Sequence, residues 1–128
     1  MLQYIDDFWI LKDSGIVLFH YQSYDEVDKN LFGAITIALN SYADLLSKGG
    51  LSSFQFISKK FTFIKKKDII FVGKSSIKAK DKDVKRELNE ISEKFLEYYP
   101  EEFVTKWNGN ITIFSDFEKV LNNSYQKN

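Results

Sequence analysis

The only histidine of the sequence, His20, follows an apolar run at residues 16–19 and is the side chain best suited to chemistry. An imidazole at this position could serve as a general base or as a metal ligand. A base needs a nucleophile within reach, and a metal needs further histidine, cysteine or carboxylate ligands. The chain contains no cysteine, and the nearby acids follow no ligand spacing: Asp6, Asp7, Asp13 and Asp25. We therefore predict a structural or surface role for His20, and no catalytic residue, metal or cofactor.

The strongest local bias is a basic segment at 59–67, KKFTFIKKK, in which lysines are interleaved with aromatic residues as on surfaces that bind single-stranded nucleic acid. A period of two, however, places Phe61 and Phe63 on one face of a strand, beneath a helix. The chain also balances 18 basic with 18 acidic residues, whereas nucleic-acid-binding domains are usually strongly basic. We predict no nucleic-acid partner. An acidic protein or an anionic lipid stays open as the partner of a basic patch of three residues: Lys65, Lys66 and Lys67.

Two further acidic pairs, Asp6-Asp7 and Asp81/Asp83, could suggest a cation site, but neither has the oxygen-ligand pattern of a calcium loop. Asp81 is better interpreted as a helix cap, and Asp6-Asp7 as a polar lead into a strand. No glycines fall into a Walker or dinucleotide-binding spacing. We expect no nucleotide hydrolysis by this chain alone.

The composition predicts one globular domain over residues 1–128. The chain is 44% hydrophobic and 16% aromatic, which is ample material for a core, and its net charge is near zero. The absence of cysteine excludes disulfides and thiolate sites, and residues 1–11 lack the features of a signal peptide. A cytoplasmic location is therefore expected, with membrane contact at most peripheral and through partners.

The first predicted element is a β-hairpin, with apolar runs at 8–11 and 16–19 around the turn Asp13-Ser14-Gly15. Continuous apolar runs predict strands that are buried on both faces. A capping box at 23–26 and a lysine and two glycines at 48–50 then bound a long helix. Its apolar face is formed by Leu31, Ile35, Ala38, Leu39, Tyr42, Leu45 and Leu46.

Three strands are predicted next, at 51–58, 60–66 and 68–75, as a meander whose last member holds the doubly buried run 69–72. A second helix is expected over 81–99, with one apolar stripe formed by Val84, Leu88, Ile91, Phe95 and Tyr98. Pro100 ends it. Residues 101–107 extend or follow that helix, 107–110 form a turn, a capping box at 115–118 starts a short helix, and 122–128 fray.

The resulting order is β-β-α-β-β-β-α-α, an α+β fold with a five-stranded, mainly antiparallel sheet between helices. This order, together with the opening hairpin FWILKDSGIVLFHY, resembles the longin domain, including longin-like proteins of archaea, over residues 4–121. Roadblock domains are similar but normally begin with an additional helix before the hairpin. The layering also resembles that of profilin.

The resemblance implies a non-enzymatic protein-interaction module, a platform in small-GTPase regulation or membrane-trafficking assemblies. Its partners would be a small GTPase or another longin or roadblock domain, or a second copy in a homodimer. The resemblance places the hairpin's second strand and strand 51–58 at the sheet edges, beside the first helix. The partner-binding residues predicted there are Phe32, Tyr42, Phe54, Phe56, Lys59 and Lys60. Phe32 and Tyr42 fit exposed anchors and core packing equally well.

Two other function classes stay open at this stage. One is an enzyme with an unrecognised site, which a deep polar pocket with perturbed carboxylates would support. The other is a nucleic-acid or anionic-lipid binder that uses the basic segment 59–67, which strongly salt-dependent binding would support.

Overall fold

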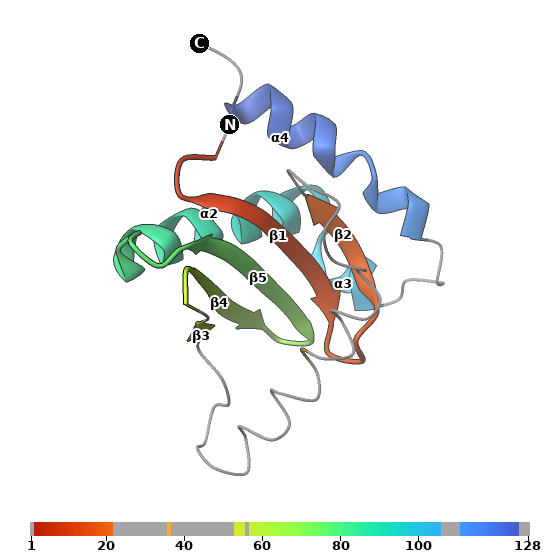
Figure 1. The fold of residues 1–128 in the computed structure, drawn as a ribbon. Helices are drawn as coiled ribbons and strands as arrows, with labels where there is room; N and C mark the ends of the chain where they lie inside the picture. Colours follow the sequence, from red (N-terminus) through yellow and green to blue (C-terminus); the bar gives the residue numbers. More distant parts are fainter. Residues whose placement is uncertain (1, 22–35, 37–52, 56, 106–110, 126–128) are drawn as a thin grey trace.

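In the computed structural model, the strands form one antiparallel sheet in the order β2-β1-β5-β4-β3 (Figure 1). The structure describes residues 2–21, 36, 53–55, 57–105 and 111–125. The strands are β1 (Ile5–Lys12), β2 (Val17–Tyr21), β3 (Ser53–Gln55), β4 (Lys59–Lys66) and β5 (Ile69–Ser76). The predicted α+β class is confirmed, and β2 and β3 are the edges, as the resemblance implied.

The opening hairpin forms where the sequence predicts it. Gly15 adopts a φ of 99°, which glycine tolerates, and its N–H donates to the carbonyl of Lys12 over 2.9 Å. The ladder then runs from Leu11 opposite Val17 to Phe8 opposite Tyr21, with an irregularity after Ile10. Strand β1 is therefore an inner strand of the sheet, paired with β2 along one edge and with β5 along the other.

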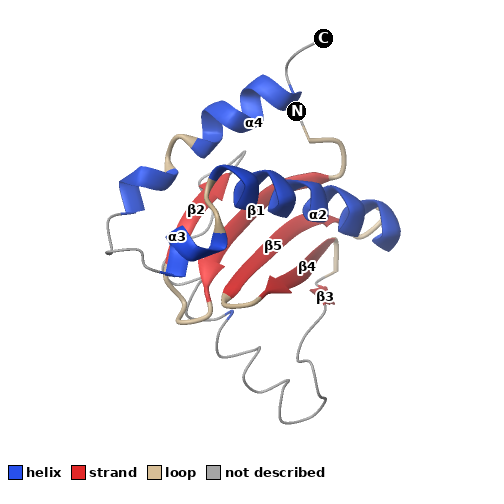
Figure 2. Ribbon diagram, turned by 180° about the vertical axis from the view of Figure 1, so that it is seen from behind, coloured by secondary structure: helices blue, strands red, loops and turns tan. Residues whose placement is uncertain are grey.

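Helices cover one face of the sheet (Figure 2). They are α2 (Asp81–Tyr98), α3 (Glu101–Thr105), a 3₁₀ turn η1 (Ile111–Phe114) and α4 (Phe117–Tyr125). None of these described helices is long and apolar enough to cross a membrane. The helix predicted over 23–48 lies outside the described residues, apart from Thr36, which is helical and buried. The turn predicted at 107–110 also lies outside them.

The end of α2 differs from the prediction by one residue. Tyr98 was expected on the buried stripe but is 52% exposed, whereas Tyr99 is buried. The backbone leaves the helix at Tyr99, with a φ of −125°, because the following Pro100 disfavours the helical conformation in the residue before it. Residues 101–105 therefore follow α2 as a separate helix.

The helix after the capping box also differs from the prediction, because α4 continues to Tyr125 into the segment expected to fray. Its side chains Phe117 and Leu121 are buried in the core and fix the first turns of the helix. Adding a further turn to an existing helix costs less than starting one, which explains why α4 continues beyond the buried residues.

Each face of the sheet carries its own buried cluster. The first cluster lies on the face that packs against α2 and α4, and includes Phe8, Ile10, Phe71 and Phe95. The second contains Trp9, Leu11, Val17, Phe61, Phe63, Ile70 and Val72. Alternate residues of β1 and β5 belong to opposite clusters, so the prediction that these strands are buried on both faces is confirmed.

Candidate interaction surface at the sheet edges

The edge strand β3 pairs with β4 through three register positions, with Phe54 opposite Phe61 at the centre. The flanking side chains of β3, Ser53 and Gln55, are exposed. An edge strand presents unpaired backbone groups that another strand can bind. The backbone of β3, the predicted partner-binding strand, therefore lies at an edge of the sheet. Predicted anchors that lie outside the described residues are Phe32, Tyr42, Phe56 and the side chain of Phe54.

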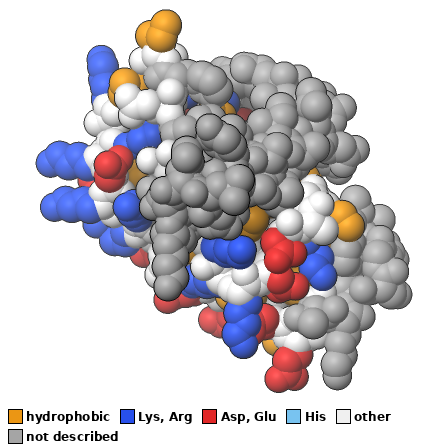
Figure 3. Space-filling model, turned by 90° about the horizontal axis from the view of Figure 1, so that it is seen from below, with side chains coloured by type: hydrophobic (Ala, Val, Ile, Leu, Met, Phe, Trp, Pro, Cys, Tyr) orange, Lys and Arg blue, Asp and Glu red, His pale blue; other side chains and the backbone are white. Residues whose placement is uncertain are grey.

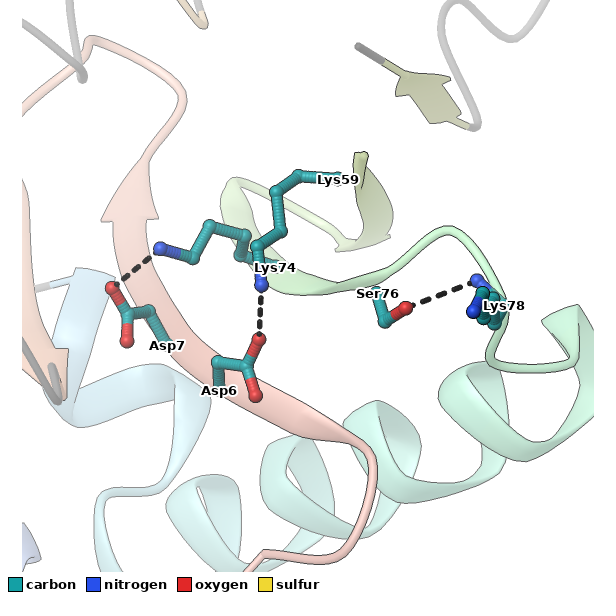
Figure 4. Close-up of polar contacts among 6 residues, drawn as sticks. All are labelled: Asp6, Asp7, Lys59, Lys74, Ser76 and Lys78. Atoms are coloured by element: carbon teal, nitrogen blue, oxygen red, sulfur yellow. Dashed lines mark hydrogen bonds and ion pairs between the residues drawn. The ribbon is translucent and has the colours of Figure 1, made fainter. Parts of the chain in front are cut away.

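The two lysines predicted at the partner-binding edge, Lys59 and Lys60, are the first residues of β4, and they have different environments. Lys59 Nζ lies 3.1 Å from the Asp6 carboxylate, and both side chains are 44% exposed (Figure 4). Lys60 is 7% exposed at its side chain, and its Nζ binds the Asp81 carboxylate and the Ala79 carbonyl. Lys59 can reach a partner, whereas Lys60 serves an internal ion pair between β4 and α2.

The acids expected to lead into the first strand lie inside β1, and that expectation is wrong. Asp7 stands opposite Lys74 of β5, and their charged groups pair over 3.2 Å with side-chain exposures of only 4% and 11% (Figure 4). Asp6 of β1 pairs with Lys59 of β4 at the same end of the sheet. Asp81 is also not the helix cap: the cap is Lys80, which makes no side-chain capping bond. These carboxylates are each paired with an ammonium group: Asp7 joins the adjacent strands β1 and β5, Asp6 joins β1 to β4 across β5, and Asp81 joins α2 to β4.

His20 lies on β2 directly opposite Trp9 of β1. The two rings stack with their centroids 4.6 Å apart and their planes 16° apart, and His20 is half-buried. Within the described residues, no group of three or more His, Cys, Asp or Glu could hold a metal ion. The ring stack on Trp9 gives His20 a packing contact within the sheet.

The basic patch Lys65, Lys66 and Lys67 lies at the far end of the β4–β5 hairpin from Lys59. Lys67 has a φ of 57°, and its Nζ lies 2.9 Å from the Glu101 carboxylate. The hydrogen bond and charge of Glu101 raise the pKa of Lys67. The aromatic residues of the basic segment 59–67, Phe61 and Phe63, are buried together. Buried rings cannot stack on bases, which removes the main feature of a single-strand-binding surface.

Sequence reasoning missed Glu87, whose side chain binds three backbone N–H groups. This buried carboxylate of α2 accepts backbone hydrogen bonds from Gln3, Tyr4 and Ile5, at 2.8, 2.9 and 2.8 Å. A signal was present, because Glu87 follows Val84 by three residues and so lies on the apolar stripe. Because buried polar groups are almost always hydrogen-bonded, a carboxylate at this position predicts donors beside it in the fold.

Tyr99, directly after α2, contacts η1. Burial, with the nearby charge of Asp116, raises the pKa of its phenol to about 12. Its hydroxyl donates to the Ile113 carbonyl over 2.9 Å. The phenol is therefore neutral at physiological pH and holds η1 in place.

No protein-family model matches the chain, and no curated protein matches it. Solved structures do match. Myxococcus xanthus MglB aligns with a TM-score of 0.55 and 10% sequence identity, over 73% of this chain and 85% of that one. A Roadblock/LC7 domain from Streptomyces avermitilis aligns with a TM-score of 0.54 and 11% identity, over 71% and 85%. The gliding protein MglB of Thermus thermophilus aligns at 0.48 with 14% identity, over 67% and 71%.

At these identities the similarity establishes the fold alone. The chain has the roadblock–longin fold, which confirms the resemblance seen in the order of its elements.

Proposed function

We propose that this chain is a non-enzymatic interaction module, a platform in a cytoplasmic assembly that regulates a small GTPase or directs membrane traffic. The observation that carries the proposal is the roadblock–longin fold with an edge strand, β3, that has exposed flanking side chains. Fold-level analogy supplies the class of function. The local chemistry is in keeping with it, because the acids first considered as a cation site are committed to ion pairs within the chain.

The proposed partner surface combines β3 with the helix predicted over 23–48. Main-chain hydrogen bonds from β3 would supply affinity, and the aromatic anchors would supply buried area. Lys59 borders this edge, whereas Lys60 is too buried to take part. The proposed contacts are Phe32, Tyr42, Phe54, Phe56 and Lys59.

Direct binding to small GTPases tests this function. The purified chain would be immobilised and offered each small GTPase of its source, loaded with GDP or with a non-hydrolysable GTP analogue. We expect at least one GTPase to bind with an affinity that depends on the nucleotide, and no GTP hydrolysis by the chain alone. If neither any GTPase nor any longin or roadblock domain of the source binds, the proposed function is wrong.

A further inference from the structure

Two exposed isoleucines lie in neighbouring segments at one end of the sheet. Ile57, in the turn between β3 and β4, is 96% exposed, and Ile77, in the loop between β5 and α2, is 38% exposed. The two segments are joined by a hydrogen bond from the Ile77 N–H to the Ser58 carbonyl, over 3.2 Å. A single exposed apolar residue is ordinary, but Ile57 protrudes almost completely beside a second one.

Exposed positive charge follows Ile77 along the chain. The three nearby acids, Asp6, Asp81 and Asp83, pair with Lys59, Lys60 and Arg86 respectively. No ion pair among the described residues involves four exposed lysines in the loop and the first turns of α2: Lys78, Lys80, Lys82 and Lys85. On the face seen from below, Lys and Arg side chains project into solvent near protruding apolar side chains (Figure 3).

The stability of α2 does not explain these lysines. Lys80 occupies the N-cap position without a side-chain capping bond, where Ser, Thr, Asp or Asn is preferred. Asp81 and Asp83 in the first turn of α2 favour the helix dipole, whereas the lysines at this end oppose it. A local departure from the folding optimum is the expected sign of a functional site.

We propose that this tip, formed by Ile57, Ile77 and the four lysines, docks on an anionic lipid bilayer. The lysines would lie among the anionic headgroups, and the isoleucines would enter the boundary of the acyl chains. A bilayer accepts a protruding apolar side chain without a preformed pocket, whereas an acidic protein would need a cavity to receive Ile57. The charge complementarity and the protrusion together favour the bilayer.

Co-sedimentation with vesicles tests this tip directly and independently of any GTPase. The vesicles would contain about 30% phosphatidylserine in phosphatidylcholine, at about 0.1 M salt, where exposed charges are only partly screened. We expect binding that pure phosphatidylcholine vesicles do not support. Each lysine near the surface is worth about fivefold in affinity, so replacing Lys78, Lys80 and Lys82 by Ser should weaken binding at least tenfold. Ile57→Ser should weaken it several-fold.

The matched control replaces Lys65, Lys66 and Lys67 by Ser, which removes the same charge from the far end of the hairpin and should leave vesicle binding nearly unchanged. Circular dichroism would verify the fold of each variant, and Lys82→Ser alone serves if the triple variant misfolds. Equal loss in the control, or no preference for phosphatidylserine, would overturn the proposal. An Ile57→Ser variant that binds vesicles like the wild type would also overturn it. Binding would then depend on charge alone, which an acidic protein surface could supply as well as a bilayer.

Discussion

A single carboxylate, Glu87, holds the segment before β1 on α2. Its oxygens accept three backbone N–H groups, and burial would leave that of Ile5 without a partner if the carboxylate were removed. Hydrogen bonds to a charged group contribute about 1.5–3 kcal/mol each, and orphaned buried donors add a penalty. Because Gln3 is exposed and its N–H can bind water instead, we expect Glu87→Ala to lower the free energy of unfolding by about 3 kcal/mol in urea denaturation, and Glu87→Gln to lower it by less.

The control for Glu87 is Glu93→Gln, an exposed position on the same helix, which should change stability by less than about 0.5 kcal/mol. Amide exchange at Ile5 should accelerate in Glu87→Ala, because its N–H loses the Oε1 acceptor. An unfolding free energy for Glu87→Ala equal to that of the wild type would show that the three bonds contribute nothing net.

At the scale of elements, the Lys60–Asp81 pair joins the start of β4 to the start of α2. The ammonium is the buried member and the carboxylate is largely exposed. The hydrogen bond and the charge of Lys60 lower the pKa of Asp81. A carboxyl with a depressed pKa in the folded chain stabilises the fold above its unfolded pKa, and this contribution is lost as the pH falls through the folded pKa.

We therefore expect Asp81→Asn to be less stable than the wild type at neutral pH, and the difference to narrow below about pH 4. Thermal melts from pH 7 to pH 2 measure this. Glu97→Gln, an exposed carboxyl on the same helix, is the control for the change of charge. A difference between Asp81→Asn and the wild type that stayed constant down to pH 2 would contradict the pairing as a source of stability.

The elements that could be predicted from sequence are those whose signals are local. The Asp13-Ser14-Gly15 turn, the buried run of β5 and the stripe of α2 each depend on neighbours in the chain, and the structure contains all three. The errors at the ends of α2 and α4 are shifts of element boundaries, whereas those at Asp7 and Lys60 concern contacts between distant segments. Asp7 was predicted to precede the first strand because its partner, Lys74, is 67 residues away in the sequence. Lys60 was predicted to contact a partner because its ion pair with Asp81 forms only when β4 and α2 come together in the fold. Long-range pairing leaves no periodic trace in a single sequence.

At the scale of the whole molecule, the burial of both sheet faces limits where a partner strand can bind. Both clusters are already packed, so the accessible backbone lies at the edges of the sheet. The β2 edge lies beside η1, and Phe19 of β2 packs edge-on against Phe117 of α4, with ring centroids 5.3 Å apart. This leaves β3 as the better edge for strand addition.

We expect the chain to dimerise through β3 and the helix predicted over 23–48, either with a second copy or with another longin or roadblock domain. Light scattering at micromolar concentration should give the mass of two chains for the homotypic pair. Phe54→Pro removes a ladder donor, and Gln55→Lys places a charge at an exposed edge position. Both should shift the chain toward the monomer, and Gln55→Lys keeps the test valid if Phe54→Pro misfolds.

Ser14→Lys adds the same charge at the hairpin turn and should leave the dimer intact. A wild-type chain that is monomeric, and that pairs with no related domain of its source, would show that β3 is not an interface.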